Sequence, residues 1–264
     1  GCQKLRKVVL GDGLTTVTAH LFEGLQALEE VVIGENVTTI GVYAFSGCKS
    51  LTDIVIPNSV TLISYDAFAN CLNLKNITWS NLLTEIGSSA FKGCTSLTYV
   101  KLPDSVKTIY FSAFEGCSLL ETIILNEGLT TIGYNAFANT AITELIIPDS
   151  VTSISNDGST SYNYSIVEGC QKLRKVVLGD GLTTVTAYLF QNLNALDEVV
   201  LGKNITTIGI RAFNNCVAFG PEMDGYGEVI IHQPNERIQI RAIEDIMKIY
   251  FKAYADLISK VSFK

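Results

Sequence analysis

The stretch that decides the fold is LTYVKLPDSVKTIYFSAFEGC, which runs from Leu97 to Cys117. Its first part alternates: Val100 and Leu102 are apolar, while Tyr99 and Lys101 between them are amphipathic or charged. Alternation with a period of two is typical of a short β-strand with one buried face. We therefore expect Val100 and Leu102 to point inward and Tyr99 and Lys101 to point outward.

The second part of this stretch turns back toward the interior. Pro103 offers no N–H to a strand ladder, and the Asp-Ser pair that follows favours a turn. Val106 and Ile109 then return to apolar positions, and the segment around Phe114 completes one coil of about 23 residues. A coil of this size cannot bury its apolar side alone, so it needs stacked neighbours.

The same pattern recurs along most of the chain. One phenylalanine position repeats at a constant step, at Phe22, Phe45, Phe68, Phe91, Phe114 and Phe137, and again at Phe190 and Phe213. Val167 takes this position once, and the step from Phe137 to Val167 is longer than the others, so a seven-residue insertion interrupts the period just before Val167. The period predicts a mainly β repeat solenoid in which equivalent strands pair into a parallel sheet on one face.

The beginning of the chain is duplicated later in the sequence. Residues 1–22 and 169–190 differ only at His20 and Tyr188. This similarity indicates a recent duplication of several coils, and by itself it predicts no functional site.

The coil pattern LxxIxIPxSV followed by AFxxC resembles the BspA-like, or Treponema-type, leucine-rich repeats. Residues 51–60 with 67–71, and the stretch from Leu97 to Cys117, follow it closely, and the resemblance covers about residues 1–216. The resemblance implies a right-handed leucine-rich-repeat coil in a secreted or cell-surface protein, with a role in adhesion to host matrix or cell-surface proteins. The family has no shared catalytic residues, so the resemblance implies no active site.

The period also predicts how the chain is organised. Residues 1–218 are interpreted as an array of about nine coils, with the insertion near 155–165, and residues 219–264 as degenerate last coils with a short helical and strand cap. A cap that covers the open end would serve solubility, and a separate functional domain is the alternative. The insertion is rich in Ser, Asn and Tyr, a composition that suits either a solvated loop or a binding loop.

Composition excludes several function classes. The net charge is −7 and the pI is about 4.9, with few and scattered Lys and Arg residues, so we expect no nucleic-acid binding. No apolar run is long enough for a membrane span, and neither a signal peptide nor an anchor is visible in this chain. We also expect no cofactor, metal or catalytic site, because no nucleotide-binding, zinc, calcium or triad pattern occurs.

The seven cysteines follow the repeat. Cys48, Cys71, Cys94, Cys117, Cys170 and Cys216 each lie three residues after the repeated Phe or Val, and Cys2 corresponds to Cys170. Leu25, Thr140 and Leu193 occupy the same position in other coils, and the two leucines indicate an apolar environment. The sequence therefore predicts a ladder of buried thiols without a structural disulfide.

Trp79 departs from the pattern, because it takes an inward strand position where other coils carry Ile56 and Leu102. A core residue with a locally satisfied indole N–H and an exposed anchor for a partner both stay open at this point.

The outward strand positions are the surface that we expect to bind a protein. They form one polar, varied column and one largely β-branched column, and the latter serves either strand pairing or partner contact. The candidate contact residues are Asp53, Val55, Asn76, Thr78, Tyr99, Lys101, Thr122 and Ile124, together with Tyr162 and Tyr164 in the insertion.

The sequence thus favours a non-catalytic protein-binding module of the secreted or cell-surface type. A structural or self-associating surface protein, in which the same columns would form an oligomer, is the first alternative. An accessory domain of a larger protein is the second, and an enzyme would need convergent carboxylates near residues 155–165.

Overall fold

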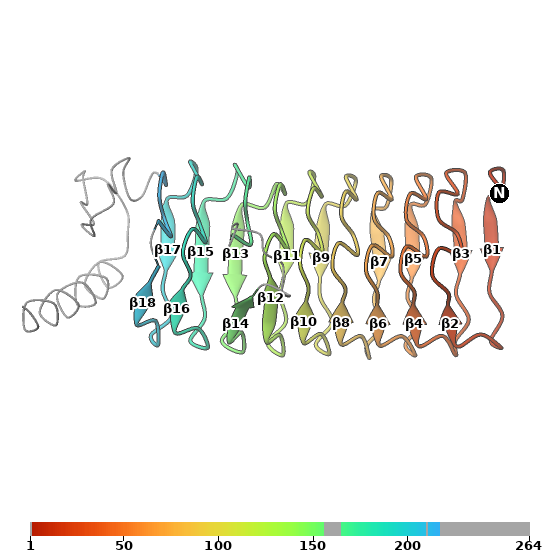
Figure 1. Cartoon of the computed structure of the whole chain (residues 1–264), viewed down its shortest axis with the longest axis horizontal. Helices are drawn as coiled ribbons and strands as arrows, with labels where there is room; N and C mark the ends of the chain where they lie inside the picture. The colour runs from red at the N-terminus through yellow and green to blue at the C-terminus, as the bar shows by residue number, and fades with distance from the viewer. Residues whose placement is uncertain (1, 156–164, 210, 217–264) are drawn as a thin grey trace, which may run out of the picture.

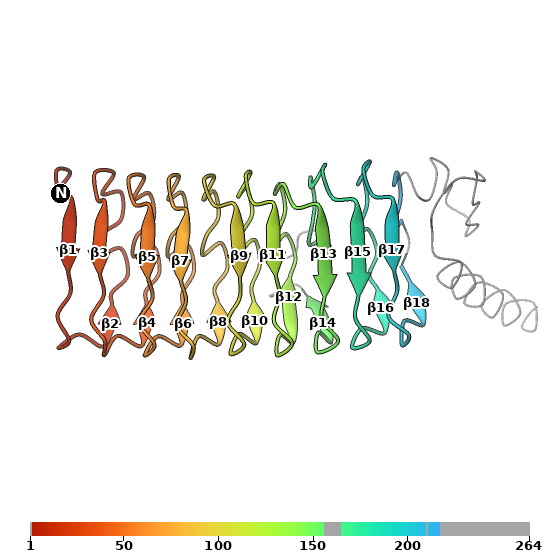
Figure 2. The same ribbon diagram turned by 180° about the vertical axis from the view of Figure 1, so that it is seen from behind.

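The computed structural model describes residues 2–155, 165–209 and 211–216, and within them the chain forms eighteen short β-strands and no helix. Successive coils stack side by side along one axis (Figures 1 and 2). This arrangement confirms the predicted repeat solenoid. The proposed C-terminal cap and most of the insertion lie outside the described residues.

The longer strands line one face, which we call the front sheet. Their middle residue points into the coil and is buried in most of them, whereas the flanking residues point outward. These strands are β1 (Lys7–Val9), β3 (Glu30–Val32), β5 (Asp53–Val55), β7 (Asn76–Thr78), β9 (Tyr99–Lys101), β11 (Thr122–Ile124), β13 (Glu144–Ile147), β15 (Lys175–Leu178) and β17 (Glu198–Val200).

A second parallel ladder, which the sequence analysis did not predict, lies on another side of the coil. It arises because a short segment before each turn, most often Thr followed by Ile or Val, is itself extended and pairs with its neighbour, as Thr108 and Ile109 pair with Thr131 and Ile132. The strands are β2 (Thr16–Val17), β4 (Thr39–Ile40), β6 (Leu62–Ile63), β8 (Glu85–Ile86), β10 (Thr108–Ile109), β12 (Thr131–Gly133), β14 (Ser153–Ser155), β16 (Thr184–Val185) and β18 (Thr207–Ile208).

The pairing of the front sheet is interrupted after β3, β7 and β11, unlike the continuous sheet that the period predicted. Hydrogen-bonded pairs join β1 to β3, β5 to β7 and β9 to β11, and a three-stranded group joins β13, β15 and β17. By contrast, β2 to β14 form one uninterrupted seven-stranded ladder. The second ladder therefore holds the coils together where the front sheet is open.

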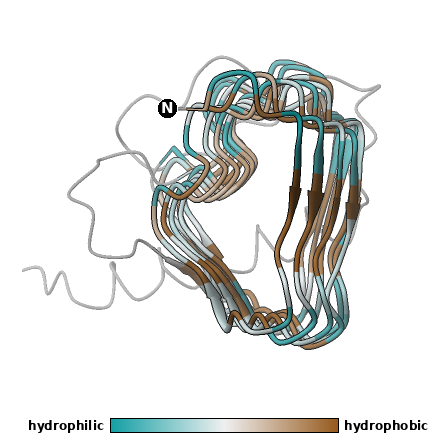
Figure 3. Ribbon diagram, turned by 90° about the vertical axis from the view of Figure 1, so that its right-hand side faces the viewer, coloured by the Kyte–Doolittle hydropathy of each residue, from teal (hydrophilic) through white to brown (hydrophobic). Residues whose placement is uncertain are grey.

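The coil interior is filled by ladders of identical side chains. The phenylalanine rings stack on one another from coil to coil, with centroids 5.2 Å apart between Phe45 and Phe68 and 5.3 Å apart between Phe68 and Phe91. The apolar strand residues surround this stack, and viewed along the long axis the coils superpose around one common interior (Figure 3). Each coil thus packs mainly against its two neighbours, as in other repeat proteins.

Next to the phenylalanines runs the predicted thiol ladder. Cys48 Sγ donates to the carbonyl oxygen of Phe22 at 3.2 Å, and the same bond recurs two coils later from Cys94 to Phe68 at 3.3 Å. Six thiols are buried, as predicted, but Cys2 is exposed because no coil of the described chain covers the first one. All seven are free thiols in this structure.

The turns around each phenylalanine need an unusual backbone conformation. The residue two positions after the phenylalanine has a positive φ throughout and is always Gly or Asn, for example Gly47 at 73° and Asn70 at 58°. Glycine lacks the Cβ that makes this region unfavourable, and Asn tolerates it better than other residues. Gly and Asn therefore suit this position, although the position two residues before the phenylalanine adopts a positive φ with larger side chains, such as Tyr43 at 54°.

Trp79 is neither fully buried nor fully exposed. Its ring meets the edge of Phe91 with centroids 5.4 Å apart, beside the interruption between β7 and β9. The following residue, Ser80, replaces the proline of neighbouring coils and is fully buried. Its hydroxyl donates to the carbonyl oxygen of Val60 at 2.7 Å and accepts from the N–H of Leu82 at 3.1 Å.

Candidate functional site

The candidate site is the outward surface of the front sheet. A three-residue strand with a buried middle residue presents its first and third side chains on the same outer face. In register, Asp53 lies beside Asn76 and Val55 beside Thr78, and likewise Tyr99 lies beside Thr122. Stacking of coils thus turns equivalent positions of successive repeats into continuous columns.

The first column is polar, and near both ends of the described array its charges are paired with one another. Lys7 Nζ lies 2.7 Å from a carboxylate oxygen of Glu30, and Lys175 Nζ lies 3.2 Å from Glu144 and 3.7 Å from Glu198. The two carboxylates hold the pKa of Lys175 above its usual value, with the hydrogen bond to Glu144 as the main cause. Exposed pairs of this kind contribute little to stability, but they set a defined charge pattern.

The middle of this column has a different character. Asn76 Nδ2 donates to Asp53 at 2.6 Å, and the hydroxyl of Thr52 donates to the same carboxylate at 2.5 Å. The two hydrogen bonds, that of Thr52 first, lower the pKa of Asp53. Beyond Asn76 the column continues with Tyr99 and Thr122 in place of acidic or basic residues, and Tyr99 is 52% exposed.

The second column is apolar over most of its length. Val55 is 59% exposed and Ile124 43%, and Val9, Val32 and Ile146 are also exposed. Thr78 and Lys101 interrupt the column near its centre, so it consists of two apolar segments. An exposed β-branched column on a soluble protein is typical of an interaction surface, although it also suits strand pairing.

The structure places eight of the ten predicted contact residues on this surface, on β5, β7, β9 and β11. Within it, Asp53 contacts Asn76, whereas β7 and β9 are not paired, so Tyr99 does not extend the hydrogen-bonded pairing of Asn76. Tyr162 and Tyr164 lie outside the described residues.

Sequence reasoning missed a groove between β11 and β13. It has a volume of about 350 Å³, and among the residues that line it are Glu121, Ile124, Glu127, Glu144 and Ile146. The signal for it was present in the sequence, because the step from Thr122 to Glu144 is one residue shorter than the steps between the paired front strands before it. The shortened coil coincides with the interruption of the front sheet at this point.

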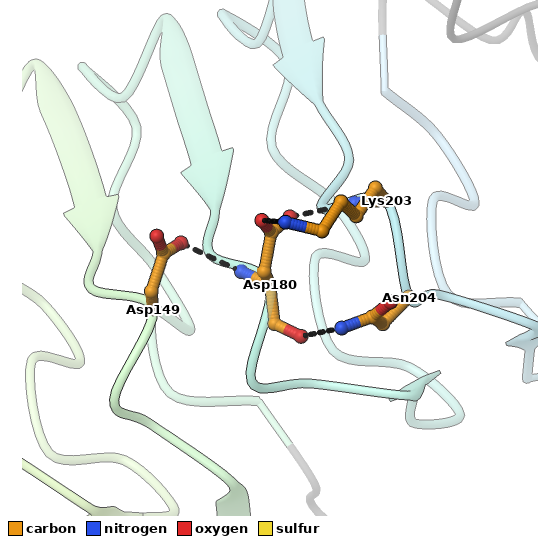
Figure 4. A network of polar contacts seen from close by, with 4 residues as sticks. All are labelled: Asp149, Asp180, Lys203 and Asn204. Carbon is orange, nitrogen blue, oxygen red and sulfur yellow. Dashed lines mark hydrogen bonds and ion pairs between the residues drawn. The ribbon is translucent and has the colours of Figure 1, made fainter.

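The turns that follow the front strands are tied together across coils. The N–H of Asp180 donates to a carboxylate oxygen of Asp149 at 2.8 Å, and Asn204 Nδ2 donates to the carbonyl oxygen of Asp180 at 2.8 Å (Figure 4). Lys203 pairs with the Asp180 carboxylate, whose pKa it lowers. Asp12 and Asn36 repeat the carbonyl bond of Asp180 and Asn204 in the first copy of the duplication, at 2.8 Å. The turns at this edge of the front sheet are therefore linked from coil to coil by hydrogen bonds and an ion pair.

Two further findings concern the described part of the chain. None of its segments forms a helix with the length and apolar character that crossing a membrane requires. Nor does it contain a group of three His, Cys, Asp or Glu side chains suited to holding a metal ion.

Comparison with known proteins yields one family and several solved structures. The family described as "BspA type Leucine rich repeat region (6 copies)" matches residues 1–98, 38–165 and 154–220. No curated protein matches the chain.

The solved structures are bacterial. A leucine-rich repeat protein from Bacteroides ovatus is 28% identical, with a TM-score of 0.58 over 82% of this chain and 66% of its own. A leucine rich cell surface protein from Faecalibacterium prausnitzii is 24% identical, with a TM-score of 0.48 over 80% of this chain and 59% of its own. The Leucine Rich Repeat protein of T. pallidum is 22% identical, with a TM-score of 0.46 over 80% of this chain and 81% of its own. The chain thus spans less than two thirds of the first two proteins.

Proposed function

Since this chain belongs to the BspA-type leucine-rich-repeat family, we propose that it is a non-catalytic protein-binding module that acts outside the cell or at the cell surface. Leucine-rich repeats of this type are typically non-catalytic, and the repeat architecture favours interaction with proteins. Adhesion to a host matrix or cell-surface protein is the specific role that we propose, and it rests on the family.

The observation that carries the proposal is the outward surface of the front sheet. Its apolar column includes Val55 and Ile124, both well exposed, and its polar column places the large side chain of Tyr99 near the middle. Protein interfaces combine an apolar and aromatic centre with a polar rim, and aromatic residues contribute disproportionately to binding. We propose Tyr99 as the central contact, with the other front-sheet candidates around it.

A binding screen against purified extracellular-matrix and cell-surface proteins tests this proposal. We expect a partner to bind the wild-type protein and the Tyr99→Glu variant to bind it at least about 10-fold more weakly, because an anchor residue contributes about 1–2 kcal/mol or more. Val55→Lys is expected to weaken binding in the same direction.

Leu82→Glu is the matched control. Leu82 is 57% exposed, close to the exposure of Tyr99, but it lies in the turn between β7 and β8 and not on the front sheet. Circular dichroism checks that each variant keeps its β-structure. Binding that is unchanged by Tyr99→Glu and lost only after deletion of residues 156–164 would contradict the front-sheet proposal and assign binding to the insertion.

The same apolar column also favours self-association, which is the second candidate function. In that case, light scattering would show concentration-dependent oligomers that the Val55→Lys variant no longer forms.

A further inference from the structure

The groove between β11 and β13 lies at an interruption of the front sheet. The two strands are not hydrogen-bonded to each other, and the shortened coil between Thr122 and Glu144 accompanies this gap. Among the lining residues, Ile123 points inward from β11 and Leu125 follows directly after the strand, and both are buried. A ligand in this groove would therefore contact the exposed apolar side chains of Ile124 and Ile146.

The charges of the groove have a simple arrangement along its length. Glu121 lies three residues before Ile124 and Glu127 three residues after it, so the two carboxylates lie toward opposite ends of β11. Within the described residues neither of them has an ion-pair partner. Glu144, on the β13 side, shares Lys175 with Glu198.

Between these carboxylates the groove is lined by isoleucine and threonine side chains, among them Thr122 and Thr143. Ile124 and Ile146, 54% exposed, face solvent from the two bordering strands. No lysine is among the described residues that line the groove, although Lys175 pairs with Glu144 and Lys107 Nζ lies beside Gly128, the residue after Glu127. The groove therefore combines carboxylates toward both ends of β11 with two exposed isoleucines between them.

We propose that this groove binds an extended segment of a partner protein that carries a basic side chain toward each end and an apolar side chain between them. The inference rests on the proposed protein-binding function and names the chemistry of the partner. Glu121 and Glu127 are six positions apart, and because β11 covers only three residues between them and Glu127 lies in the following turn, they are at most about 20 Å apart, the reach of a partner segment of up to about seven residues. Charge complementarity selects the basic residues, and the exposed isoleucines select the apolar one.

A synthetic peptide tests the groove directly. The probe is a capped, fluorescently labelled heptapeptide with lysine at both ends, isoleucine in the middle and threonine elsewhere, and its binding to the full chain is measured by fluorescence anisotropy at low salt. We expect saturable binding that weakens as salt is added, because exposed charge pairs are screened. The double variant Glu121→Lys and Glu127→Lys is expected to bind roughly 10- to 30-fold more weakly, from two lost attractions and two new repulsions.

Glu35→Lys is the matched control, because Glu35 occupies the position of Glu127 in the coil of β3. It is expected to change the affinity by less than about 2-fold, since its charge lies several coils away. The reciprocal pair gives a second control: a peptide with glutamate at both ends should bind the double variant better than it binds the wild-type protein.

The possible results separate this inference from the proposed function. The groove is ruled out if the lysine peptide fails to bind at millimolar concentration, if the double variant binds it as well as the wild type, or if Glu35→Lys weakens binding equally. If a protein partner is nevertheless captured and lost with Tyr99→Glu, the front-sheet function stands without the groove. The groove is supported if the double variant loses binding of the lysine peptide and gains binding of the glutamate peptide, whether or not the screen finds a partner.

Discussion

Because six of its thiols are buried, we expect the free energy of unfolding of this protein to fall steeply in alkaline solution. Burial raises the pKa of Cys48, Cys117 and Cys216 to about 12. It also raises the pKa values of Cys71, Cys94 and Cys170, with burial as the largest cause for each. In an unfolded chain a cysteine has a pKa of about 8.5. The perturbation to apply is therefore an increase of pH from 7 to about 10.5.

The direction and size of this change in stability follow from the number of protons that the thiols bind in the folded and unfolded states. Below about pH 8 the thiols are protonated in both states, so their contribution to the free energy of unfolding is constant. Between about pH 8.5 and 12 the folded state holds protons that the unfolded state releases, so each thiol lowers the free energy of unfolding by about 1.4 kcal/mol per pH unit. At pH 10 three such thiols together have lowered the free energy of unfolding by about 6 kcal/mol, which is comparable with the whole stability of a typical domain.

The assay is urea unfolding at a series of pH values, in reducing buffer, followed by the fluorescence of Trp79, the single tryptophan of the chain. Cys117→Ala is expected to be less stable than the wild type at pH 7, because it leaves a small cavity. Above pH 9, however, its free energy of unfolding should fall less steeply by about 1.4 kcal/mol per pH unit. Cys2→Ala is the matched control and should leave the slope unchanged, because Cys2 is exposed.

Comparison between variants removes the other groups that titrate in this range, since all variants share the same tyrosines and lysines. Equal slopes for Cys117→Ala and the wild type would refute the argument. The argument would also be refuted if a thiol reagent at pH 8 modified any of the six buried cysteines of the native protein as fast as it modifies Cys2.

Two further predictions concern the ladders that hold the coils together. Phe91→Ala should destabilise the protein by about 3–5 kcal/mol in urea unfolding. Phe22→Ala should cost about 1 kcal/mol less, because Phe91 stacks on a ring at both sides and Phe22 on only one ring. Equal losses of stability in the two variants would contradict a contribution from the second stacked ring. Ser80→Ala should cost about 1–3 kcal/mol, since it removes both hydrogen bonds of a buried hydroxyl. Ser59→Ala, which loses one bond at a partly buried site, should cost less, and a Ser80→Ala protein within about 0.5 kcal/mol of the wild type would contradict this account.

Much of the architecture could be predicted from the sequence, because in a solenoid a period maps directly onto space. The step from Phe68 to Phe91, equal to the steps on either side of it, already implies that the two side chains lie in one column. The alternation around Val100 predicts which side chains point outward, and the substitution of cysteine by Leu25 and Leu193 predicts a buried thiol position. Each of these inferences needs only a local pattern and its repetition.

The surface that we propose to bind a partner was predictable to the same extent. The outward positions of β5 to β11 follow from the strand pattern, and the structure places them on one face. Whether a partner contacts them is a property of the partner as well, so that part stays a prediction for the binding screen.

What the sequence by itself determined is thus the coil, its period and the inward or outward direction of each side chain. Only the tertiary structure decided how closely neighbouring coils approach one another. Four features depend on this approach: the second ladder from β2 to β14, the interruptions of the front sheet, the partial burial of Trp79 and the groove beside Glu121. The physical reason is that a period specifies which residues are neighbours, whereas the distance between two strands depends on the packing of all side chains and turns between the two coils at once. A single missing residue between Thr122 and Glu144 leaves the apolar pattern intact, yet it accompanies an open groove in the sheet.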